Sequence, residues 1–272
     1  MPFVNNHGIE IHYEIEGQGP PLIMQHGFSG TLDAWRIAGY VQELSKNYKC
    51  IFLSARGRGQ SDKPHDPKAY YFKNMVLDLV AVLDDLKIKK AHYLGYSMGG
   101  AIGFRIPMHA PDRFYSLMLG GNGYTSGKAS QKYEDLGPAY DALEQAVKDK
   151  KDNPMAIFLP IYEKNLGAMA PERRTATLAQ DATALAAAWR ARKEEGSPEA
   201  ASYLPRIKLP CLIYAGEADP RCADAKESAN QIPGAQFFSL PGLNHSQCNA
   251  HSELTLPHIK KFLAEVSKNI PN

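Results

Sequence analysis

The sequence has no strong excess of one charge and no long hydrophobic run. Lys and Arg number 31 against 29 Asp and Glu, which leaves a formal net charge of +2. Binding to nucleic acid or to an anionic membrane requires a broad basic surface, so this balance argues against both partners. No stretch reaches about 18 uninterrupted apolar residues, and we therefore expect no transmembrane helix.

Cysteine is also scarce, with four residues at positions 50, 211, 222 and 248 and no CxxC pair. A chain of 272 residues does not depend on disulfides for its stability, so we expect reduced thiols. The first ten residues lack the basic stretch and apolar run of a signal peptide. These absences together predict a cytoplasmic protein.

Common cofactor motifs are missing as well. The sequence contains neither GxGxxG nor HExxH, and the segment GYTSGK at residues 123–128 is one residue too short for a phosphate-binding loop. We therefore expect no nicotinamide, flavin or other cofactor and no catalytic metal.

What is present is an ordinary globular composition, 44% hydrophobic and 22% charged, in which short apolar runs alternate with longer amphipathic segments. This alternation is typical of a largely parallel sheet covered by helices. Residues 9–15 alternate apolar and polar side chains and are expected to form an antiparallel edge strand. Buried strands are expected at residues 21–25, 50–53, 91–94, 115–119, 212–215 and 237–240. Helices are expected at about residues 75–86, 98–110, 223–230 and 252–267.

The alternation is interrupted between residues 121 and 204, where no segment has strand character. Three or four helices are expected there, with starts near Pro154 and Pro171, because proline is favoured in the first helical turn. One helix face is expected to pack on the main domain, and it consists of Leu178, Ala182, Leu185 and Trp189. We predict a core of residues 1–120 and 205–272 and a helical cap of residues 121–204.

The sequence GYSMGG at residues 95–100 lies between an expected strand and an expected helix. In that context GxSxG forms a sharp turn that exposes the serine hydroxyl, and small residues two positions away on either side avoid a collision. Ser97 is therefore the candidate nucleophile. An ordinary glycine-rich turn between a strand and a helix is the alternative.

A serine hydroxyl needs a general base and an acid that orients the base. His245 is the candidate base, because it follows the last expected strand and precedes the last expected helix. Asp219 is the candidate acid, because it lies just beyond the strand expected at 212–215, where sites of parallel sheets assemble. Glu217 and Asp224 are the alternatives for this role.

An acyl-transfer site also needs donors directed at the developing oxyanion. The segment HGFSG at residues 26–30 follows an expected strand, and the proposed donors are the backbone amides of Phe28 and Met98. Candidates for substrate contact are the side chains of Phe28, Tyr96 and Trp189. Several aromatic residues of the cap suggest an apolar pocket, namely Tyr124, Tyr133, Tyr140, Phe158, Tyr162 and Trp189.

The segments HGFSG, GYSMGG, GEADP and LNH occur in this order, and with them the chain resembles the α/β-hydrolase fold superfamily over nearly its whole length. It is most similar to small bacterial serine esterases, lactonases and carbon–carbon bond hydrolases. The resemblance implies a mostly parallel, eight-stranded-type sheet flanked by helices, with the superfamily's variable cap at residues 121–204. It also implies Ser97 as nucleophile, Asp219 as acid, His245 as base, and Phe28 and Met98 as oxyanion donors. A serine at position 97, where haloalkane dehalogenases and epoxide hydrolases carry aspartate, argues against those two activities.

One segment, SARGRGQS at residues 54–61, departs from the superfamily pattern. Members usually have aspartate at the position of Ser54 and often histidine at the position of Arg58. Loss of the carboxylate is expected to leave Arg56 without a partner, and Arg58 is expected to bring positive charge toward the oxyanion hole. Such changes would affect loop stability or substrate preference, and neutral surface variation is the alternative.

The sequence thus predicts a serine hydrolase that cleaves a small, fairly apolar carboxylic ester or lactone through an acyl-serine intermediate. The expected partner is the small-molecule substrate. Two alternatives remain open at this point: carbon–carbon bond hydrolysis of a diketone-type substrate by the same triad, and a ligand sensor of the same fold with slow turnover.

Overall fold

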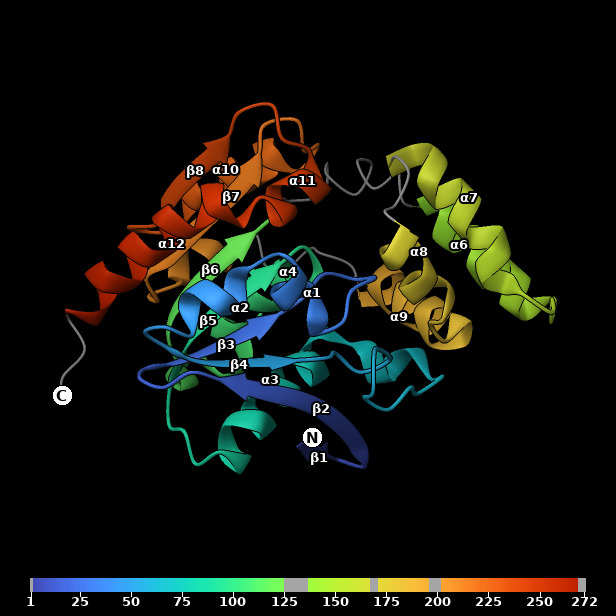
Figure 1. Ribbon diagram of the computed structural model, residues 1–272, viewed down its shortest axis with the longest axis horizontal. Helices are drawn as coiled ribbons and strands as arrows, with labels where there is room; N and C mark the ends of the chain where they lie inside the picture. The colour runs from blue at the N-terminus through green and yellow to red at the C-terminus, as the bar shows by residue number, and fades with distance from the viewer. Residues whose placement is uncertain (1, 125–136, 167–170, 196–201, 269–272) are drawn as a thin grey trace.

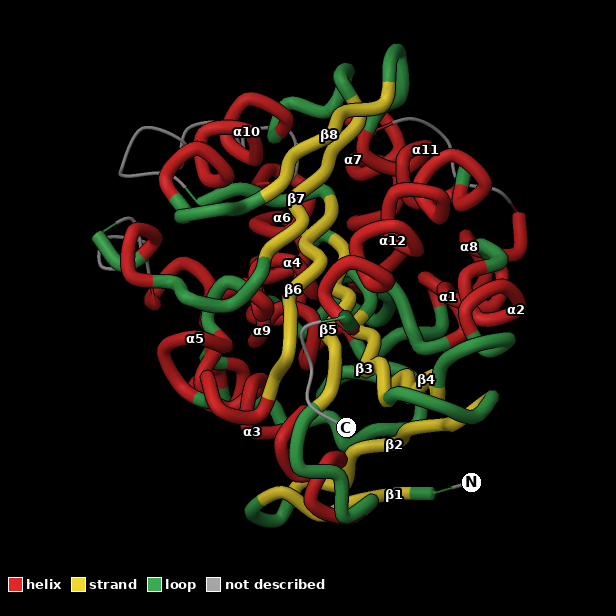
Figure 2. The backbone as a smooth tube through the Cα atoms, turned by 90° about the vertical axis from the view of Figure 1, so that its left-hand side faces the viewer, coloured by secondary structure: helices red, strands yellow, loops and turns green. Residues whose placement is uncertain are grey.

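The structure is a computed structural model that describes residues 2–124, 137–166, 171–195 and 202–268. Within these residues, eight strands form one sheet in the order β1-β2-β4-β3-β5-β6-β7-β8, which Figure 2 shows from β1 at the bottom to β8 at the top. The strands are β1 (Phe3–Asn6), β2 (Ile9–Glu16), β3 (Pro21–Gln25), β4 (Lys49–Leu53), β5 (Ala91–Tyr96), β6 (Phe114–Gly120), β7 (Cys211–Gly216) and β8 (Gln236–Leu240). Strand β2 is antiparallel to both of its neighbours, and the other pairs are parallel.

The expected buried strands are all found, but the prediction for the first edge was wrong. Strand β2 is antiparallel as expected, yet it lies between β4 and the short strand β1, which is the true edge. Strand β1 has only four residues, and its sequence FVNN ends in two asparagines, which are disfavoured in strands. Its pairing therefore depends on the tertiary hairpin with β2 and gives no strong local signal.

Two layers of helices cover the sheet, one on each face. Consecutive strand residues point to opposite faces, so Ile23 packs on one side and its neighbours Leu22 and Met24 on the other. The Ile23 side is covered by α3 (Phe72–Asp85), α4 (Met98–Gly103), α5 (Ile106–His109) and α10 (Cys222–Gln231). The Leu22 side is covered by α1 (Asp33–Ile37), α2 (Tyr40–Leu44), α11 (His245–Ala250) and α12 (Ser252–Ser267). The described residues also form the short 3-10 helices η1 (Pro67–Tyr70), η2 (Pro111–Arg113) and η4 (Leu204–Arg206).

The described part of the chain between strands β6 and β7 contains four helices. They lie together beside this core, at the right of Figure 1. They are α6 (Gly137–Lys148), α7 (Pro154–Leu166), α8 (Pro171–Leu178) and α9 (Ala182–Glu195), so the helix starts expected at Pro154 and Pro171 are confirmed. Tyr133, one of the expected pocket aromatics, lies outside the described residues. No helix of the described residues is long and apolar enough to cross a membrane.

The apolar stripe predicted from Leu178 to Trp189 does not form one helix face. Leu178 ends α8 and is 36% exposed, whereas Leu185 and Trp189 belong to α9. The latter two pack inside the cap with Tyr140 and Phe158, and the main domain meets this cluster through Phe28. The contact with the core is instead made by the small side chains of α9, namely Ala184, Ala187, Ala188 and Ala191. Alanine permits this close approach because its side chain ends at Cβ.

Candidate active site

Ser97 stands at the sharp turn between strand β5 and helix α4. Its backbone angles are φ 55° and ψ −108°, an uncommon conformation for a residue with a side chain. The neighbouring glycines leave the room that this turn requires. A Cβ on Gly95 would lie 2.4 Å from the carbonyl oxygen of Gly99, and a Cβ on Gly99 would lie 2.0 Å from the carbonyl oxygen of Gln25. The GxSxG spacing is therefore a steric requirement of this turn.

The structure brings Ser97, His245 and Asp219 together from three separate loops. The Oγ atom of Ser97 lies 2.9 Å from Nε2 of His245, and Nδ1 of the same ring lies 2.5 Å from Oδ2 of Asp219. Ser97 follows β5, Asp219 follows β7 and His245 begins α11 just after β8. All three loops lie at the carboxyl ends of their parallel strands, where the sequence placed the site.

The second oxygen of Asp219 is also bound. Oδ1 accepts hydrogen bonds from the backbone N–H of Arg221 at 3.0 Å and from its Nη1 at 3.3 Å. The Asp219 carboxylate is fully buried, and burial alone would raise its pKa, but the hydrogen bond to His245 and the charge of Arg221 lower the pKa below its ordinary value. The sequence did not single out Arg221, although a cation two residues after a candidate acid is within reach of it.

The alternative acid Glu217 does not contact the His245 ring. Its carboxylate accepts a hydrogen bond from the hydroxyl of Ser239 at 2.9 Å on the adjacent strand. Asp224, the other alternative, lies one turn into α10. The aspartate that meets the histidine is therefore Asp219.

Tyr96 contacts both the backbone and the ring of His245. Its hydroxyl donates to the carbonyl oxygen of His245 at 2.5 Å, and its ring lies 5.3 Å from the imidazole. Tyr96 is only 4% exposed and does not line the cavity described below. The structure therefore does not place its side chain where a substrate contact was expected. At the start of α11, Asn244 and Gln247 form a reciprocal capping box that fixes the backbone next to His245.

The loop at residues 26–30 lies directly beside Ser97. A Cβ on Gly27 would be 3.3 Å from the Cβ of Ser97, so this glycine allows the close approach. The backbone N–H groups of Phe28 and of Met98, the first residue of α4, have no acceptor among the described residues. Both expected oxyanion donors therefore remain available on the two segments that flank the nucleophile.

His26 holds this loop in place as a neutral ring. Its Nε2 accepts the backbone N–H of Ala55 at 3.0 Å, which requires the proton to be on Nδ1, and Nδ1 lies 2.7 Å from the carbonyl oxygen of Gly27. Burial lowers the pKa of His26 to about 4. The carbonyl of Gly27 shares a peptide unit with the N–H of Phe28, so the bond from His26 orients that donor and increases its polarity.

A small cavity adjoins the two candidate oxyanion donors. It is a narrow, partly open space of ≈ 20 Å³ between the core and helix α9. The lining side chains are mostly apolar, with one cation and one carboxylate from α9, and they are Phe28, Tyr70, Phe72, Met75, Met98, Ala188, Arg192 and Glu195. Of these lining residues, the sequence indicated only Phe28 and Met98 as site residues. The others have no local sequence signal, because they come together only where η1, α3 and α9 pack against one another.

Trp189 does not line this cavity and reaches the site through Phe28. Its ring stacks on Tyr140 at 4.8 Å and meets Phe28 edge-on at 6.4 Å, and its Nε1 donates to Asp141 at 2.9 Å. Phe28 also contacts Tyr140 at 4.9 Å. The side chain of Phe28 therefore joins the nucleophile loop to the aromatic interior of the cap.

The segment at residues 54–61 corrects one expectation. Arg56 is not left without a partner, because its guanidinium binds the buried carboxylate of Asp78 through two nitrogens at 2.8 and 2.6 Å. Asp78 lies on helix α3, where its side chain is buried. Ser54 is buried and its Oγ accepts the backbone N–H of Leu32 at 3.3 Å, so a hydroxyl fills the position where an aspartate was expected.

Arg58 is buried next to the candidate oxyanion hole, as its position suggested. Its Nε donates to the carbonyl oxygen of Phe28 at 2.7 Å, and its guanidinium carbon lies 4.8 Å from the centre of the Phe28 ring. The side chain is 1% exposed. The alternative of neutral surface variation is therefore wrong for this residue.

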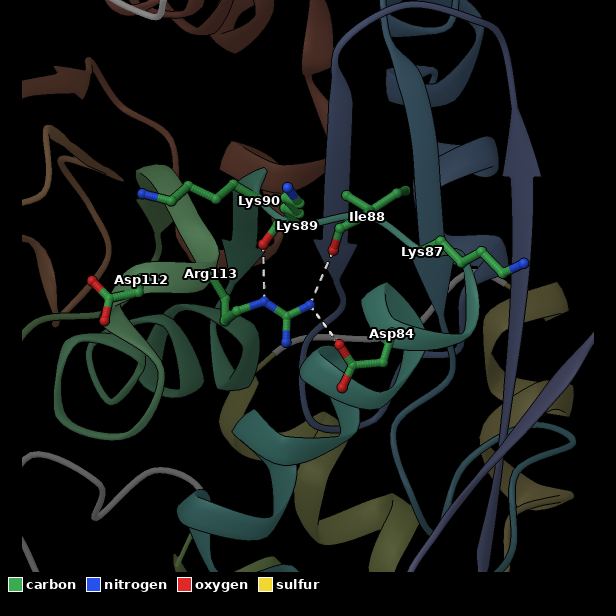
Figure 3. A pocket seen from close by; sticks show the side chains of 7 residues that line it. All are labelled: Asp84, Lys87, Ile88, Lys89, Lys90, Asp112 and Arg113. Carbon is green, nitrogen blue, oxygen red and sulfur yellow. Dashed lines mark hydrogen bonds and ion pairs between the residues drawn. The ribbon is translucent and has the colours of Figure 1, made fainter.

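A wider hollow lies at the opposite end of the sheet (Figure 3). Its lining residues directly precede β5 and β6, so it opens at the amino ends of these strands; they are Asp84, residues 87–90, Asp112 and Arg113. Strand β5 has six residues and spans about 20 Å, which separates the hollow from Ser97. In Figure 3, Arg113 is held by Asp84 and by the carbonyls of Ile88 and Lys89. The hollow therefore has no part in the chemistry of the triad.

Among the described residues, no group of three or more His, Cys, Asp or Glu side chains is placed to hold a metal ion.

Comparison with known proteins agrees with this geometry. The family model of the alpha/beta hydrolase fold matches residues 20–248. The chain is 28% identical over 221 residues to 3-oxoadipate enol-lactonase 2 of Acinetobacter baylyi, covering 78% of this chain and 77% of the relative.

Two solved structures share the fold. An esterase of Thermogutta terrifontis superposes with a TM-score of 0.77 at 22% identity, covering 97% of this chain and 98% of the other. A meta-cleavage product hydrolase of Pseudomonas fluorescens superposes with the same TM-score of 0.77 at 20% identity, with 97% and 98% coverage. The sheet order, the loops at its carboxyl edge and the family match lead to one assignment: the chain belongs to the α/β-hydrolase fold family.

Proposed function

We propose that the protein is a serine hydrolase that cleaves a small, fairly apolar carboxylic ester or lactone through an acyl-Ser97 intermediate. The continuous chain from Ser97 Oγ through the His245 ring to Asp219 is the observation that carries this proposal. The similarity to an enol-lactonase over 78% of the chain supports the substrate class. The apolar lining beside Phe28 and Met98 supports an acyl group of low polarity.

The geometry accounts for each step of acyl transfer. Ser97 attacks the carbonyl carbon while Nε2 of His245 accepts its proton, and the amides of Phe28 and Met98 bind the oxyanion. His245 then gives the proton to the leaving alkoxide. A water molecule, deprotonated by the same ring, attacks the acyl-enzyme and releases the acid. Asp219 holds the ring with Nδ1 protonated and stabilises the imidazolium that forms in both halves of the reaction.

A panel of p-nitrophenyl esters and lactones tests the proposal. We expect the parent protein to be active on short or medium acyl chains, and Ser97→Ala to lower kcat by about 10⁴- to 10⁶-fold, as in other serine triads. Ser116→Ala is a matched control, because Ser116 also has a histidine partner, His92, at 2.8 Å but lies inside the sheet away from the site. Equal activity of the parent and Ser97→Ala would contradict the nucleophile assignment.

The same panel separates the two alternative functions. A diketone-type substrate that is cleaved while all esters and lactones fail would favour carbon–carbon bond hydrolysis. A ligand sensor would give a single burst of product equal to the amount of protein, followed by negligible turnover. A linear steady state with an ester would support the proposed activity over both.

A further inference from the structure

Arg58 has an unusual electrostatic position for a buried cation. Its side chain is 1% exposed, yet no carboxylate of the described residues lies within ion-pair distance of it. Its other hydrogen bond is donated by Nη1 to the carbonyl oxygen of Gly57 at 3.0 Å. By contrast, Arg56, two residues away, has the carboxylate of Asp78 as its counter-ion.

The groups whose electrostatic effect opposes the burial of Arg58 do not form an ion pair with it. They are Tyr70, Tyr140 and Asp181, and the ion pair of the Asp181 carboxylate is with His65. Burial lowers the pKa of Arg58, but a guanidinium starts so high that it stays protonated at neutral pH. A buried positive charge without a counter-ion is costly to maintain. A buried positive charge of this kind stabilises an anion that forms beside it during the reaction.

Arg58 holds Phe28 at two points. Nε binds the carbonyl oxygen of Phe28 at 2.7 Å, and the plane of the guanidinium rests near the Phe28 ring at 4.8 Å. On the other side of the same residue, the bond from His26 to the carbonyl of Gly27 fixes the preceding peptide unit. The N–H of Phe28 therefore lies between two anchored carbonyl groups.

We propose that Arg58 is a positioning residue of the oxyanion hole, which fixes the N–H of Phe28 toward the reacting carbonyl and stabilises the oxyanion with its buried charge. This inference rests on the proposed serine-hydrolase function. Its physical basis is that donors and charges held in place before the reaction stabilise the transition state without reorganising. The anion that Arg58 serves is thus the tetrahedral oxyanion of an ester, a lactone or another electrophile bound to Ser97.

The test uses three variants of the full-length protein and one steady-state substrate. Arg58→Gln removes the charge and the contact with the Phe28 ring, whereas Arg58→Lys keeps the charge but loses the Nε bond. The matched control is Arg105→Met, because Arg105 is also a buried arginine, 8% exposed, and its guanidinium stacks on the rings of Phe72 and Tyr124 at 4.3 and 4.2 Å. Thermal unfolding of each variant is recorded beside its kinetics.

We expect Arg58→Gln to lower kcat about 10- to 100-fold with KM changed less than about threefold, since the oxyanion exists in the transition state and not in the bound substrate. Arg58→Lys should lie between Arg58→Gln and the parent. Arg105→Met should lose thermal stability but keep kcat within about threefold of the parent. A fully structural Arg58 would instead give the pattern of the control, with parental kcat in the folded fraction, and that result overturns the proposal.

A second readout does not depend on finding the substrate. A fluorophosphonate forms a bond from Ser97 Oγ to phosphorus while fluoride leaves and His245 takes the serine proton, and the phosphoryl oxygen occupies the oxyanion hole. The labelling rate constant should fall about 10-fold or more in Arg58→Gln, and an unchanged rate overturns the inference even if no ester is cleaved. If Arg58→Gln does not fold, Arg58→Lys decides, since parental kcat and labelling rate in that variant contradict the proposal. Failure of the parent to react with any ester or with the probe would instead refute the proposed function itself.

Discussion

At the scale of single residues, the two oxygens of Asp219 divide their work. Oδ2 meets the His245 ring, and Oδ1 is occupied by two donors of Arg221. The carboxylate therefore cannot rotate away from the histidine without breaking the second set of bonds. Its lowered pKa also keeps it ionised at neutral pH, which is the state that accepts the hydrogen bond from Nδ1–H of His245.

Replacement of Asp219 by asparagine should show this role. An amide at this position would present a donor to Nδ1 and favour the wrong tautomer of His245, so we expect Asp219→Asn to lower kcat by roughly 10⁴-fold. The matched control is Glu217→Gln, a carboxylate two residues earlier that binds Ser239 instead of the ring. Steady-state kinetics on the best ester of the panel gives both values. A larger loss in Glu217→Gln than in Asp219→Asn would reverse the assignment of the acid.

At the scale of elements, Glu195 of the cap domain binds the N-terminus of helix α3 in the core. Helix α3 begins at Phe72 without a side-chain cap of its own, and the backbone N–H of Phe72 donates to both carboxylate oxygens of Glu195 at 3.0 and 2.9 Å. A negative charge at a helix N-terminus is stabilising. Glu195 ends α9 and also lines the cavity, so this contact sets the distance between the cap and the acyl side of the site.

Removal of the Glu195 carboxylate should weaken the attachment of α9 to the core. We expect Glu195→Ala to lower the free energy of unfolding by about 1 kcal/mol, the usual value of a capping side chain, and to increase proteolytic cleavage near the end of α9. Glu194→Ala is the control, because Glu194 accepts an exposed hydrogen bond from the hydroxyl of Tyr71 at 3.2 Å and this bond does not involve the N-terminal N–H of α3. Thermal unfolding and limited proteolysis measure the two effects. Indistinguishable behaviour of the two variants would show that Glu195 does not act as the cap of α3.

The elements also show which features the sequence alone could predict. The parallel strands, helix α12 and the turn at Ser97 carry strong local patterns, and they were predicted within a few residues. Helices α1 and α2 have five residues each and were missed. A helix of about one and a half turns is too short to show a repeating apolar pattern.

Contacts between distant segments were predicted less well than the elements themselves. The site loops could be ordered because parallel strands place their carboxyl ends at one edge. By contrast, the pairing of Arg56 with Asp78 and the cavity contribution of Ala188 depend on how α3 and α9 dock. That docking is set by tertiary packing, which a local pattern does not contain.

At the scale of the whole molecule, buried neutral histidines link stability to pH. His92 lies inside β5 with 0% exposure, and burial lowers its pKa to about 4, as it does for His26. In the unfolded chain both titrate near 6.5. As pH falls below that value, the unfolded state takes up protons that the folded state refuses until about pH 4, so stability is lost across this window. Glu195 and Asp78, whose pKa values are raised by burial, act in the opposite direction.

His92 gives the cleanest test of this linkage, because it lies in the sheet away from the triad. A pKa displaced from 6.5 to about 4 is expected to remove about 2 to 3 kcal/mol of stability between pH 7.5 and pH 4.5. Urea unfolding at these two pH values should therefore show a smaller loss in His92→Gln than in the parent. Ser116→Ala, which keeps the histidine and removes its hydrogen-bond partner, should retain the parental pH dependence. The same loss in the parent and in His92→Gln would show that His92 contributes nothing to the pH dependence of this fold.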